Sequence, residues 1–333
     1  LISLRDYRFS YHFNHSCSED IQRYCQEEAR SADKAQIIQC LSRILFEHKV
    51  LGTEKTLKPE CKKQLKTAFL QQEQFDDMAH MQDAHKKLMS HCHNDIEKYN
   101  CFNDAKSFED VIECLRENSA NLEPACQALI FDREKIEALD NEFDDELQKT
   151  CQMDIKRYCQ GYHEDEVVKC LSNAKVIRLL SPECQKVVFE RMHEQVQDIR
   201  LNVPLFEACQ KEAELHCSED FKKIHDKRYE EKMLAGVIIQ CLRAKFTQGV
   251  ILSEKCKAEI SNVIVESEFD VRLDPPLYRF CKNVVVNQCK EHFIRRGFNI
   301  YEALECLKEE YRSGRVRDEN WARNSETFTR VSS

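Results

Sequence analysis

The chain has 333 residues, of which 42% are hydrophobic, and this apolar content suits two or three folded domains rather than a disordered chain. Glycine and proline number only six each, which argues against an all-β or α/β protein and for helices joined by short connections. The net charge of −9 is spread without a long single-sign block, so we expect no nucleic-acid partner. We also expect no membrane span, because no apolar run reaches about 18 residues.

Nineteen cysteines lie almost evenly between Cys17 and Cys306. Such an inventory is typical of disulfide-bonded proteins of the secretory pathway or the cell exterior. A cytosolic zinc protein is the alternative, but the chain contains no CxxC and no HxxxH motif. We therefore expect disulfides, with neither a metal nor a cofactor.

The cysteines repeat in groups of four along the chain. The groups are Cys17, Cys25, Cys40, Cys61; Cys92, Cys101, Cys114, Cys126; Cys151, Cys159, Cys170, Cys184; Cys209, Cys217, Cys241, Cys256; and the incomplete Cys281, Cys289, Cys306. This period predicts repeats at residues 1–71, 72–136, 137–195 and 196–267, a partial fifth repeat at 268–312, and a disordered tail at 313–333.

Apolar residues around the cysteines predict three helices in each unit. Apolar residues four positions before and four after each first cysteine, such as Phe13 and Ile21 around Cys17, form one stripe of an opening helix. Every third cysteine precedes a leucine in a second, shorter amphipathic helix. A proline two residues before the fourth cysteine, as in Ser181-Pro182, predicts the start of a third helix with Ser181 as its N-cap. The segments between helices vary in length, and we expect them to be loops.

The first two cysteines of a unit cannot bond to each other, because eight helical residues separate them by about 12 Å. We favour a nested pairing, first with fourth and second with third, which closes a helical hairpin at both ends. The crossed pairing, first with third and second with fourth, also fits if the short helix lies one turn deeper. The nested pairs are Cys17–Cys61, Cys25–Cys40, Cys92–Cys126, Cys101–Cys114, Cys151–Cys184, Cys159–Cys170, Cys209–Cys256, Cys217–Cys241 and Cys289–Cys306, with Cys281 a free thiol.

No catalytic motif is present: the chain has no GxSxG, HExxH, P-loop or GxGxxG sequence, so we expect no enzyme. Acidic residues stand three positions after four first cysteines, at Asp20, Asp95, Asp154 and Glu212. We interpret them as the solvated face of each opening helix rather than as a repeated site. His91 and His93 flank Cys92, but an oxidised Cys92 could not supply a thiolate to a metal.

Three further features could bind a partner. The basic residues Lys290, His292, Arg295 and Arg296 could contact a sulfated glycan, although a solvated helix surface is the favoured interpretation. The alternating aromatics Tyr7, Phe9, Tyr11 and Phe13 could form a strand or a binding edge, and we favour core contacts that cap the first unit. Asn14, in Asn-His-Ser, is the single N-glycosylation sequon.

These patterns resemble the Golgi apparatus protein 1 family, also known as the cysteine-rich fibroblast growth factor receptor and E-selectin ligand. The resemblance rests on CSEDIQRYC and CQMDIKRYC, on the Cys-Leu of IIQCLS and VIECLRE, on the LxPEC turn, and on RDYRFSYHFNHSC and RLDPPLYRFC. It covers residues 1 to about 310. It departs where the fifth unit lacks its last cysteine, and where the family's C-terminal membrane helix and cytoplasmic tail have no counterpart.

The resemblance implies a non-enzymatic glycoprotein of the Golgi lumen, or of the cell surface or exterior. It implies binding of secreted growth factors, either fibroblast growth factors or the transforming growth factor β precursor, during Golgi transit. The alternative is a structural spacer whose glycans are recognised by a selectin. A third hypothesis, a saposin-like lipid carrier, lacks the six-cysteine arrangement of that class.

Overall fold

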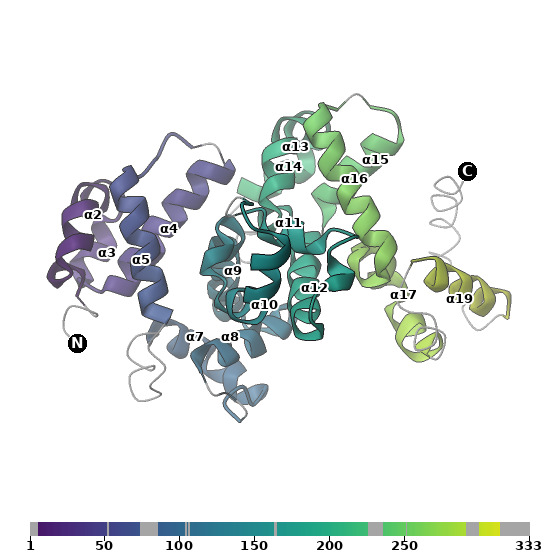
Figure 1. Ribbon diagram of the computed structural model, residues 1–333, viewed down its shortest axis with the longest axis horizontal. Coiled ribbons are helices and arrows are strands. Elements are labelled where there is room, and N and C mark those ends of the chain that lie inside the picture. The colour runs from purple at the N-terminus through teal and green to yellow at the C-terminus, as the bar shows by residue number, and fades with distance from the viewer. Residues whose placement is uncertain are drawn as a thin grey trace. The chain divides into compact units, whose positions relative to one another are not determined.

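Helices form the regular secondary structure of the residues that the structure describes, apart from an isolated bridge between Asp6 and Asp33 (Figure 1). The structure is a computed structural model, and it describes residues 6–51, 53–73, 86–103, 105, 107–162, 165–225, 236–250, 252–290 and 300–313. The chain divides into two compact units, Leu1–Glu259 and Ile260–Ser333. The predicted all-α class, with helices stapled by disulfides, is confirmed. The predicted tail lies outside the described residues from 314 onward.

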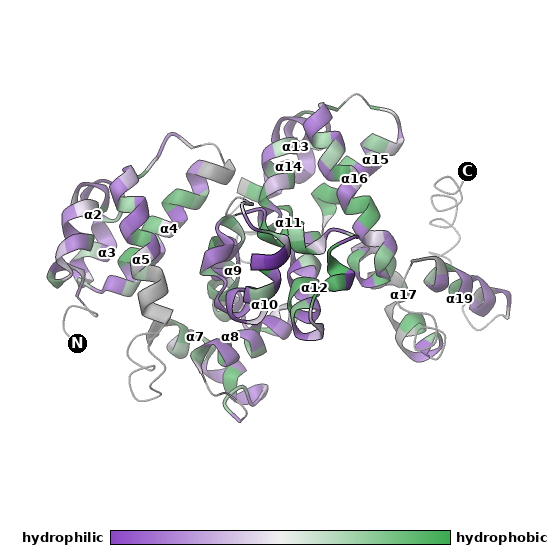
Figure 2. Ribbon diagram, in the orientation of Figure 1, coloured by the Kyte–Doolittle hydropathy of each residue, from purple (hydrophilic) through white to green (hydrophobic). Residues whose placement is uncertain are grey.

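The opening helix of each repeat buries its first cysteine between two apolar residues, as Phe13, Cys17 and Ile21 show with at most 2% exposure. These helices carry hydrophobic and hydrophilic residues on different faces (Figure 2). In the first, third and fourth repeats the helix ends one residue before the second cysteine, which is its C-cap. The opening helices are α2 (Tyr11–Tyr24), α7 (Lys86–Lys98), α10 (Asp145–Tyr158), α13 (Val203–His216) and α17 (Pro275–Asn287).

The second helix of each repeat carries the third cysteine and the leucine that follows it. These helices are α4 (Lys34–Leu51), α8 (Phe108–Glu117), α11 (Val167–Ser172), α15 (Val237–Thr247) and α19 (Ile300–Arg312). The segments before α4 and α15, which we expected to be loops, contain two more helices, α3 (Gln26–Ser31) and α14 (Ser218–His225). The first and fourth repeats therefore have four helices rather than three.

The third helix begins at the predicted proline in three repeats and at Glu254 in the fourth. These helices are α5 (Pro59–Glu73), α9 (Pro124–Leu139), α12 (Pro182–Gln197) and α16 (Glu254–Phe269). A proline is tolerated there because the first helical N–H has no partner within the helix. Ser181 is the N-cap of α12, as predicted: its Oγ accepts a hydrogen bond from the Cys184 N–H at 3.4 Å.

The repeated acidic residue of the opening helix caps this third helix from a distance. Asp20 accepts a hydrogen bond from the Lys58 N–H at 3.0 Å, and Asp95 accepts one from the Glu123 N–H at 3.0 Å. The same bond joins Asp154 to Ser181 and Glu212 to Ser253. Asp20, Asp95 and Asp154 are at most 7% exposed. Our interpretation of these aspartates as a solvated face is therefore wrong, because their carboxylates satisfy backbone donors at the start of another helix.

A 3₁₀ turn capped by an aspartate leads into four of the opening helices. The turns are η1 (Tyr7–Phe9), η3 (Asn141–Phe143), η5 (Ile199–Leu201) and η7 (Val271–Leu273), while η2 (Ser119–Asn121) and η4 (Ile177–Leu179) precede third helices. In η5 the Asp198 carboxylate accepts hydrogen bonds from both the backbone N–H and the guanidinium of Arg200. The same Asp-x-Arg arrangement recurs at Asp6 and Asp270.

Nine disulfides join the helices within the repeats. They are Cys17–Cys61, Cys25–Cys40, Cys92–Cys126, Cys101–Cys114, Cys151–Cys184, Cys159–Cys170, Cys209–Cys256, Cys217–Cys241 and Cys289–Cys306. In the four complete repeats the pairs are those of the nested arrangement. Half-cystines are central to each repeat's core, where Cys17, Cys92, Cys151 and Cys209 have no exposed surface. The disulfides therefore replace part of the apolar core that a repeat of about 60 residues cannot build alone.

The core of the second compact unit, Ile260–Ser333, contains Val271, Leu277 and Val285 around Cys281 and the Cys289–Cys306 pair.

The repeat boundaries expected from the sequence fall in the last turns of α5, α9, α12 and α16. No helix among the described residues is apolar and long enough to cross the hydrocarbon core of a bilayer.

Candidate functional site

Many charged side chains of the described residues gather within the compact unit Leu1–Glu259, where the second repeat meets the third. We call these residues the junction cluster: Glu109, Glu113 and Arg116 of α8; Arg133, Glu134 and Glu137 of α9; Asp144 and Glu146 at the start of α10; and Arg191 and Glu194 of α12. The side chains of Arg116, Glu134, Asp144 and Arg191 are at most 5% exposed. Buried charges require partners, so their contacts determine how this junction holds together.

The two repeats exchange ion pairs in both directions. Arg116 of the second repeat lies 3.4 Å from Glu194 of the third, and Arg191 of the third lies 3.0 Å from Glu113 of the second. Within its own repeat, Arg191 donates from Nε to Asp144 at 2.6 Å. Arg116 likewise contacts Glu137 of its own repeat. Each arginine therefore binds both sides of the junction.

Carboxyl groups outnumber arginines in the junction cluster by seven to three. Burial, together with the hydrogen bond and charge of Glu113, raises the pKa of Glu146 to about 8. Burial raises the pKa of Glu194 to about 7 although Arg116 and Arg191 oppose it. Burial also raises the pKa of Glu134 well above its usual value. These raised pKa values favour the protonated, neutral form of Glu134, Glu146 and Glu194, which lowers the excess negative charge of the cluster.

Two carboxyl groups of the junction cluster are shifted in the opposite direction. Burial opposes the ionisation of Glu113, but Arg116 and Arg191 outweigh it and hold the pKa of Glu113 below its usual value. Burial is likewise outweighed at Asp144, whose pKa is lowered by its contacts with Arg191. Glu113 and Glu146 therefore form an unequal pair. The protonated Glu146 carboxyl donates a hydrogen bond, and the ionised Glu113 carboxylate accepts it.

A metal ion does not fit this cluster well. One carboxylate oxygen from each of Glu113, Glu146 and Glu190 lies within 4.8 Å of the others. Arg191 already donates to both Glu113 and Glu146, at 3.0 and 3.2 Å. A guanidinium in that position repels a cation and uses the lone pairs that would bind it. A second group, Cys25, Glu28 and Cys40, has no thiolate because its two cysteines form a disulfide.

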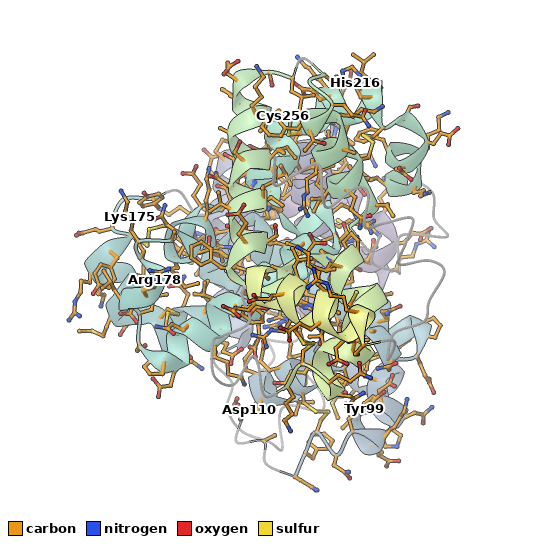
Figure 3. All side chains as sticks on the ribbon, turned by 90° about the vertical axis from the view of Figure 1, so that its right-hand side faces the viewer. Tyr99, Asp110, Lys175, Arg178, His216 and Cys256 are labelled. Atoms are coloured by element: carbon orange, nitrogen blue, oxygen red, sulfur yellow. A yellow bond between two sulfur atoms is a disulfide. The ribbon has the colours of Figure 1, made fainter. Side chains whose placement is uncertain are left out.

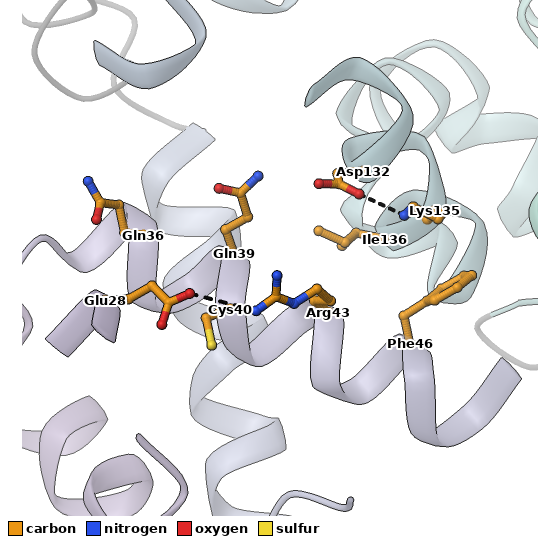
Figure 4. Close-up of a pocket in the computed structure, with 9 residues that line it drawn as sticks. All are labelled: Glu28, Gln36, Gln39, Cys40, Arg43, Phe46, Asp132, Lys135 and Ile136. Atoms are coloured by element: carbon orange, nitrogen blue, oxygen red, sulfur yellow. Dashed lines mark ion pairs between the residues drawn. The ribbon is translucent and has the colours of Figure 1, made fainter. Parts of the chain in front are cut away.

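A separate cavity of about 290 Å³ lies between α4 and α9, at the contact of the first repeat with the second (Figure 4). Its charged side chains are paired, Arg43 with Glu28 at 3.6 Å and Lys135 with Asp132 at 2.6 Å. Phe46 and Ile136 provide its apolar wall. The lining contains equal numbers of acidic and basic groups, and the volume is at the lower limit for small-molecule sites. Nothing in this lining has the geometry of a nucleophile beside a base.

The remaining residues singled out in the sequence lie apart from one another. His91 and His93 are exposed, and His93 pairs with Glu97 at 3.3 Å, while Cys92 between them is bonded to Cys126. Asn14 lies in α2 and is half-buried. Burial and the charge of Asp274 raise the pKa of the free Cys281 thiol to about 11. The basic residues His292, Arg295 and Arg296 lie outside the described residues.

The aromatic run at the beginning of the chain divides between core and surface. Phe13 is 2% exposed, whereas Phe9 and Tyr11 are 63% and 72% exposed. Tyr7 packs partly against the core. The expectation that all four are core contacts is therefore wrong for Phe9 and Tyr11, and the segment forms a 3₁₀ turn and a helix rather than a strand.

Sequence reasoning missed the junction cluster entirely. Glu113 and Arg116 are three residues apart on one helix, a spacing that is typical of solvated ion pairs. Surface residues of the same kind are common in this chain: Lys175 and Arg178, for example, are exposed in the third repeat (Figure 3). The Asp-x-Arg turns were detectable, because Asp6, Asp198 and Asp270 each precede an arginine by two residues and an opening helix by a few more.

The comparisons with known proteins agree with the repeat architecture. A family described as "Cysteine rich repeat" matches residues 1–49, 59–123, 124–177, 182–250 and 254–315. The chain is 48% identical over 96% of its length to "Golgi apparatus protein 1 homolog" of Caenorhabditis elegans. It is 30% identical over 92% of its length to Golgi apparatus protein 1 of Mus musculus and 29% identical to that of Homo sapiens. No solved structure matches the chain significantly.

The chain spans about a quarter of the length of these relatives, 28% of the nematode protein and 25% of the mouse and human proteins. Their names place it in the Golgi apparatus and the secretory pathway, which agrees with its nine disulfides. The five consecutive repeat matches together cover most of its residues. The chain therefore belongs to the cysteine-rich repeat family, among the relatives of Golgi apparatus protein 1.

Proposed function

We propose that this Golgi-associated, non-enzymatic chain is a lumenal binding scaffold for secreted growth factors, either fibroblast growth factors or a transforming growth factor β precursor. The observation that carries the proposal is the tandem array itself, five matches to one repeat in a chain whose described helices are joined by nine disulfides. Repeat arrays of this kind present extended surfaces that bind other proteins. The short name of the matched family contains the abbreviation FGFR, which supports the proposal only as a name.

The alternative is a spacer whose glycans, rather than its polypeptide, are recognised by a selectin. The sequon at Asn14 is the feature that favours it, since a helix that begins at Tyr11 holds Asn14 near one end of the first repeat. The Asn14→Gln variant removes this glycan and keeps a polar side chain of similar shape. Comparing the two proteins therefore separates binding by the polypeptide from binding by the glycan.

The test is binding of purified fibroblast growth factor and of transforming growth factor β precursor to the immobilised oxidised chain. We expect micromolar or tighter binding by the wild type and by Asn14→Gln, and none by the chain after reduction and alkylation. If instead a selectin binds the wild type and does not bind Asn14→Gln, the spacer is established. Failure of every growth factor to bind either folded protein would refute the scaffold.

A further inference from the structure

The junction cluster contains more buried acid than its arginines can neutralise. Arg191 bridges Asp144 and Glu146 of its own repeat and Glu113 of the preceding one, at 2.6, 3.2 and 3.0 Å. Arg191 also lies 3.5 Å from Glu194, so one guanidinium faces four carboxyl groups. Since the Glu113, Glu146 and Glu190 carboxylates approach within 4.8 Å in a half-buried site, ionising all of them would place like charges together with little water to screen them. A proton shared by Glu113 and Glu146 removes that repulsion.

The groups that surround this shared proton come from all four helices at the junction. On α8 they are Glu109, Glu113, Arg116 and Glu117; on α9, Arg133, Glu134 and Glu137; at the start of α10, Asp144 and Glu146; on α12, Lys186, Glu190, Arg191 and Glu194. Lys186 is 69% exposed, so water screens its charge. Arg133 is committed to Glu109 and Glu137. None of these contacts supplies a second buried cation to Glu146.

We propose that the contact between the second and third repeats is a proton-dependent joint: it is closed while Glu146 and its neighbours hold protons, and it loosens when they ionise. The direction follows from which state binds the proton. The closed joint holds protons that the opened, solvated carboxyl groups release, so raising the pH favours opening. The opened carboxyl groups titrate at about pH 4 to 5, whereas in the closed joint the pKa of Glu146 is about 8 and that of Glu194 about 7, so opening becomes easier from about pH 5 up to about pH 8.

This range is the one that a secretory protein crosses between an acidic lumen and neutral surroundings. In the acidic compartment the second and third repeats would be held in one fixed arrangement. At the higher pH they would move more freely, which changes whether surfaces on the two repeats can engage one partner at the same time. The joint therefore provides a way to couple binding along the array to the compartment.

The Glu146→Gln variant imitates the protonated state. Its amide oxygen can still accept from Arg191, and its NH₂ group can donate to Glu113 as the shared proton does. The matched control is Glu183→Gln, an exposed position two turns earlier on the same helix as Arg191. A second variant, Glu194→Gln, keeps an acceptor for Arg116 and serves where Glu146→Gln fails to give a helical circular dichroism spectrum.

The experiment is backbone hydrogen exchange of the whole oxidised chain at pH 6 and pH 8, divided by the intrinsic exchange rates. We expect the opening equilibrium of α8 and α12 to rise by about tenfold per pH unit for each proton released in the wild type and in Glu183→Gln. Glu146→Gln should remove the contribution of Glu146 and so lower the rise between pH 6 and pH 8 by about tenfold or more, leaving the contribution of Glu194, and α13 should be unaffected in all variants. A wild-type opening equilibrium that does not change with pH, or an undiminished rise in both glutamine variants, would overturn the proposal.

Discussion

The acidic residues that follow four of the first cysteines cap another helix, a role that the sequence pattern did not reveal. Asp20, Asp95 and Asp154 occupy positions that an amphipathic-helix argument assigns to solvent. Their partners are backbone N–H groups 27 to 38 residues further along the chain, so no local pattern identifies them. The recurrence of an acid three residues after a first cysteine was visible, but its meaning depends on how the third helix packs against the first.

Replacing Asp95 by alanine should destabilise the second repeat. The Asp95 carboxylate is 1% exposed and accepts the Glu123 N–H at the start of α9, so its loss removes the cap from a half-buried helix N-terminus. We expect the free energy of unfolding to fall by about 1–2 kcal/mol in urea titrations. The control is Glu97→Ala on the same helix, whose side chain is 68% exposed. Equal losses in the two variants would mean that the carboxylate does not act as a remote cap.

Cys281 should be the single cysteine that reacts without reduction. It is buried, and burial raises its thiol pKa to about 11, so at pH 8 only about one molecule in a thousand carries the reactive thiolate. We expect almost no labelling by iodoacetamide in the folded protein and one label per chain in denaturant. Peptide mapping should place that label on Cys281 and recover the nine nested pairs. A label on another cysteine, or crossed pairs in a repeat, would contradict this arrangement.

At the scale of helices, the sequence predicted best those helices whose position is set by a local pattern of residues. The stripe around each first cysteine and the proline before each fourth cysteine located α2, α5, α9, α10, α12 and α13 because both signals act within a helical turn. Helices α3 and α14 were missed because they are short: α3 has no buried residue, and α14 has only the pair Phe221 and Ile224 on its buried face. Both helices lie in the segment between the second and third cysteines, which varies in length from repeat to repeat.

The 3₁₀ turn between α12 and α13 should depend strongly on Asp198. Its carboxylate is fully buried and pairs with an Arg200 side chain that is 4% exposed, so Asp198→Ala removes the carboxylate that neutralises a buried guanidinium. We expect a loss of about 3–5 kcal/mol in the free energy of unfolding. The same substitution at Asp6 should have a far smaller effect, because its partner Arg8 is 60% exposed. Urea unfolding of both variants measures the difference, and similar losses would show that burial does not govern the strength of this turn.

At the scale of the whole molecule, the array depends on contacts between repeats that no single repeat encodes. The period of the cysteines predicted where repeats occur, but the junction cluster combines charges 78 residues apart, such as Glu113 and Arg191. The first repeat contacts the third in a different way: Lys66 reaches Asp140 at 2.8 Å and Glu142 at 2.9 Å, beside the 3₁₀ turn that leads into α10. Repeats of similar sequence are therefore joined by contacts that differ from one junction to the next.

Removing Arg191 should make the stability of the array depend more steeply on pH. In Arg191→Leu the Glu113, Asp144 and Glu146 carboxyl groups lose their shared cation, so the pKa of Glu146 rises further and the pKa values of Glu113 and Asp144, which Arg191 holds low, rise as well. The folded state then binds more protons than the unfolded state as the pH increases, and folding loses free energy with rising pH. We expect the variant to be less stable than the wild type by about 3–5 kcal/mol at pH 8 and by clearly less at pH 5, in urea unfolding at both values. Arg178→Leu, at an exposed position, is the control and should change stability little at either pH. An Arg191→Leu loss that is equal at pH 5 and pH 8 would show that this arginine stabilises the junction through packing of its side chain rather than through its charge.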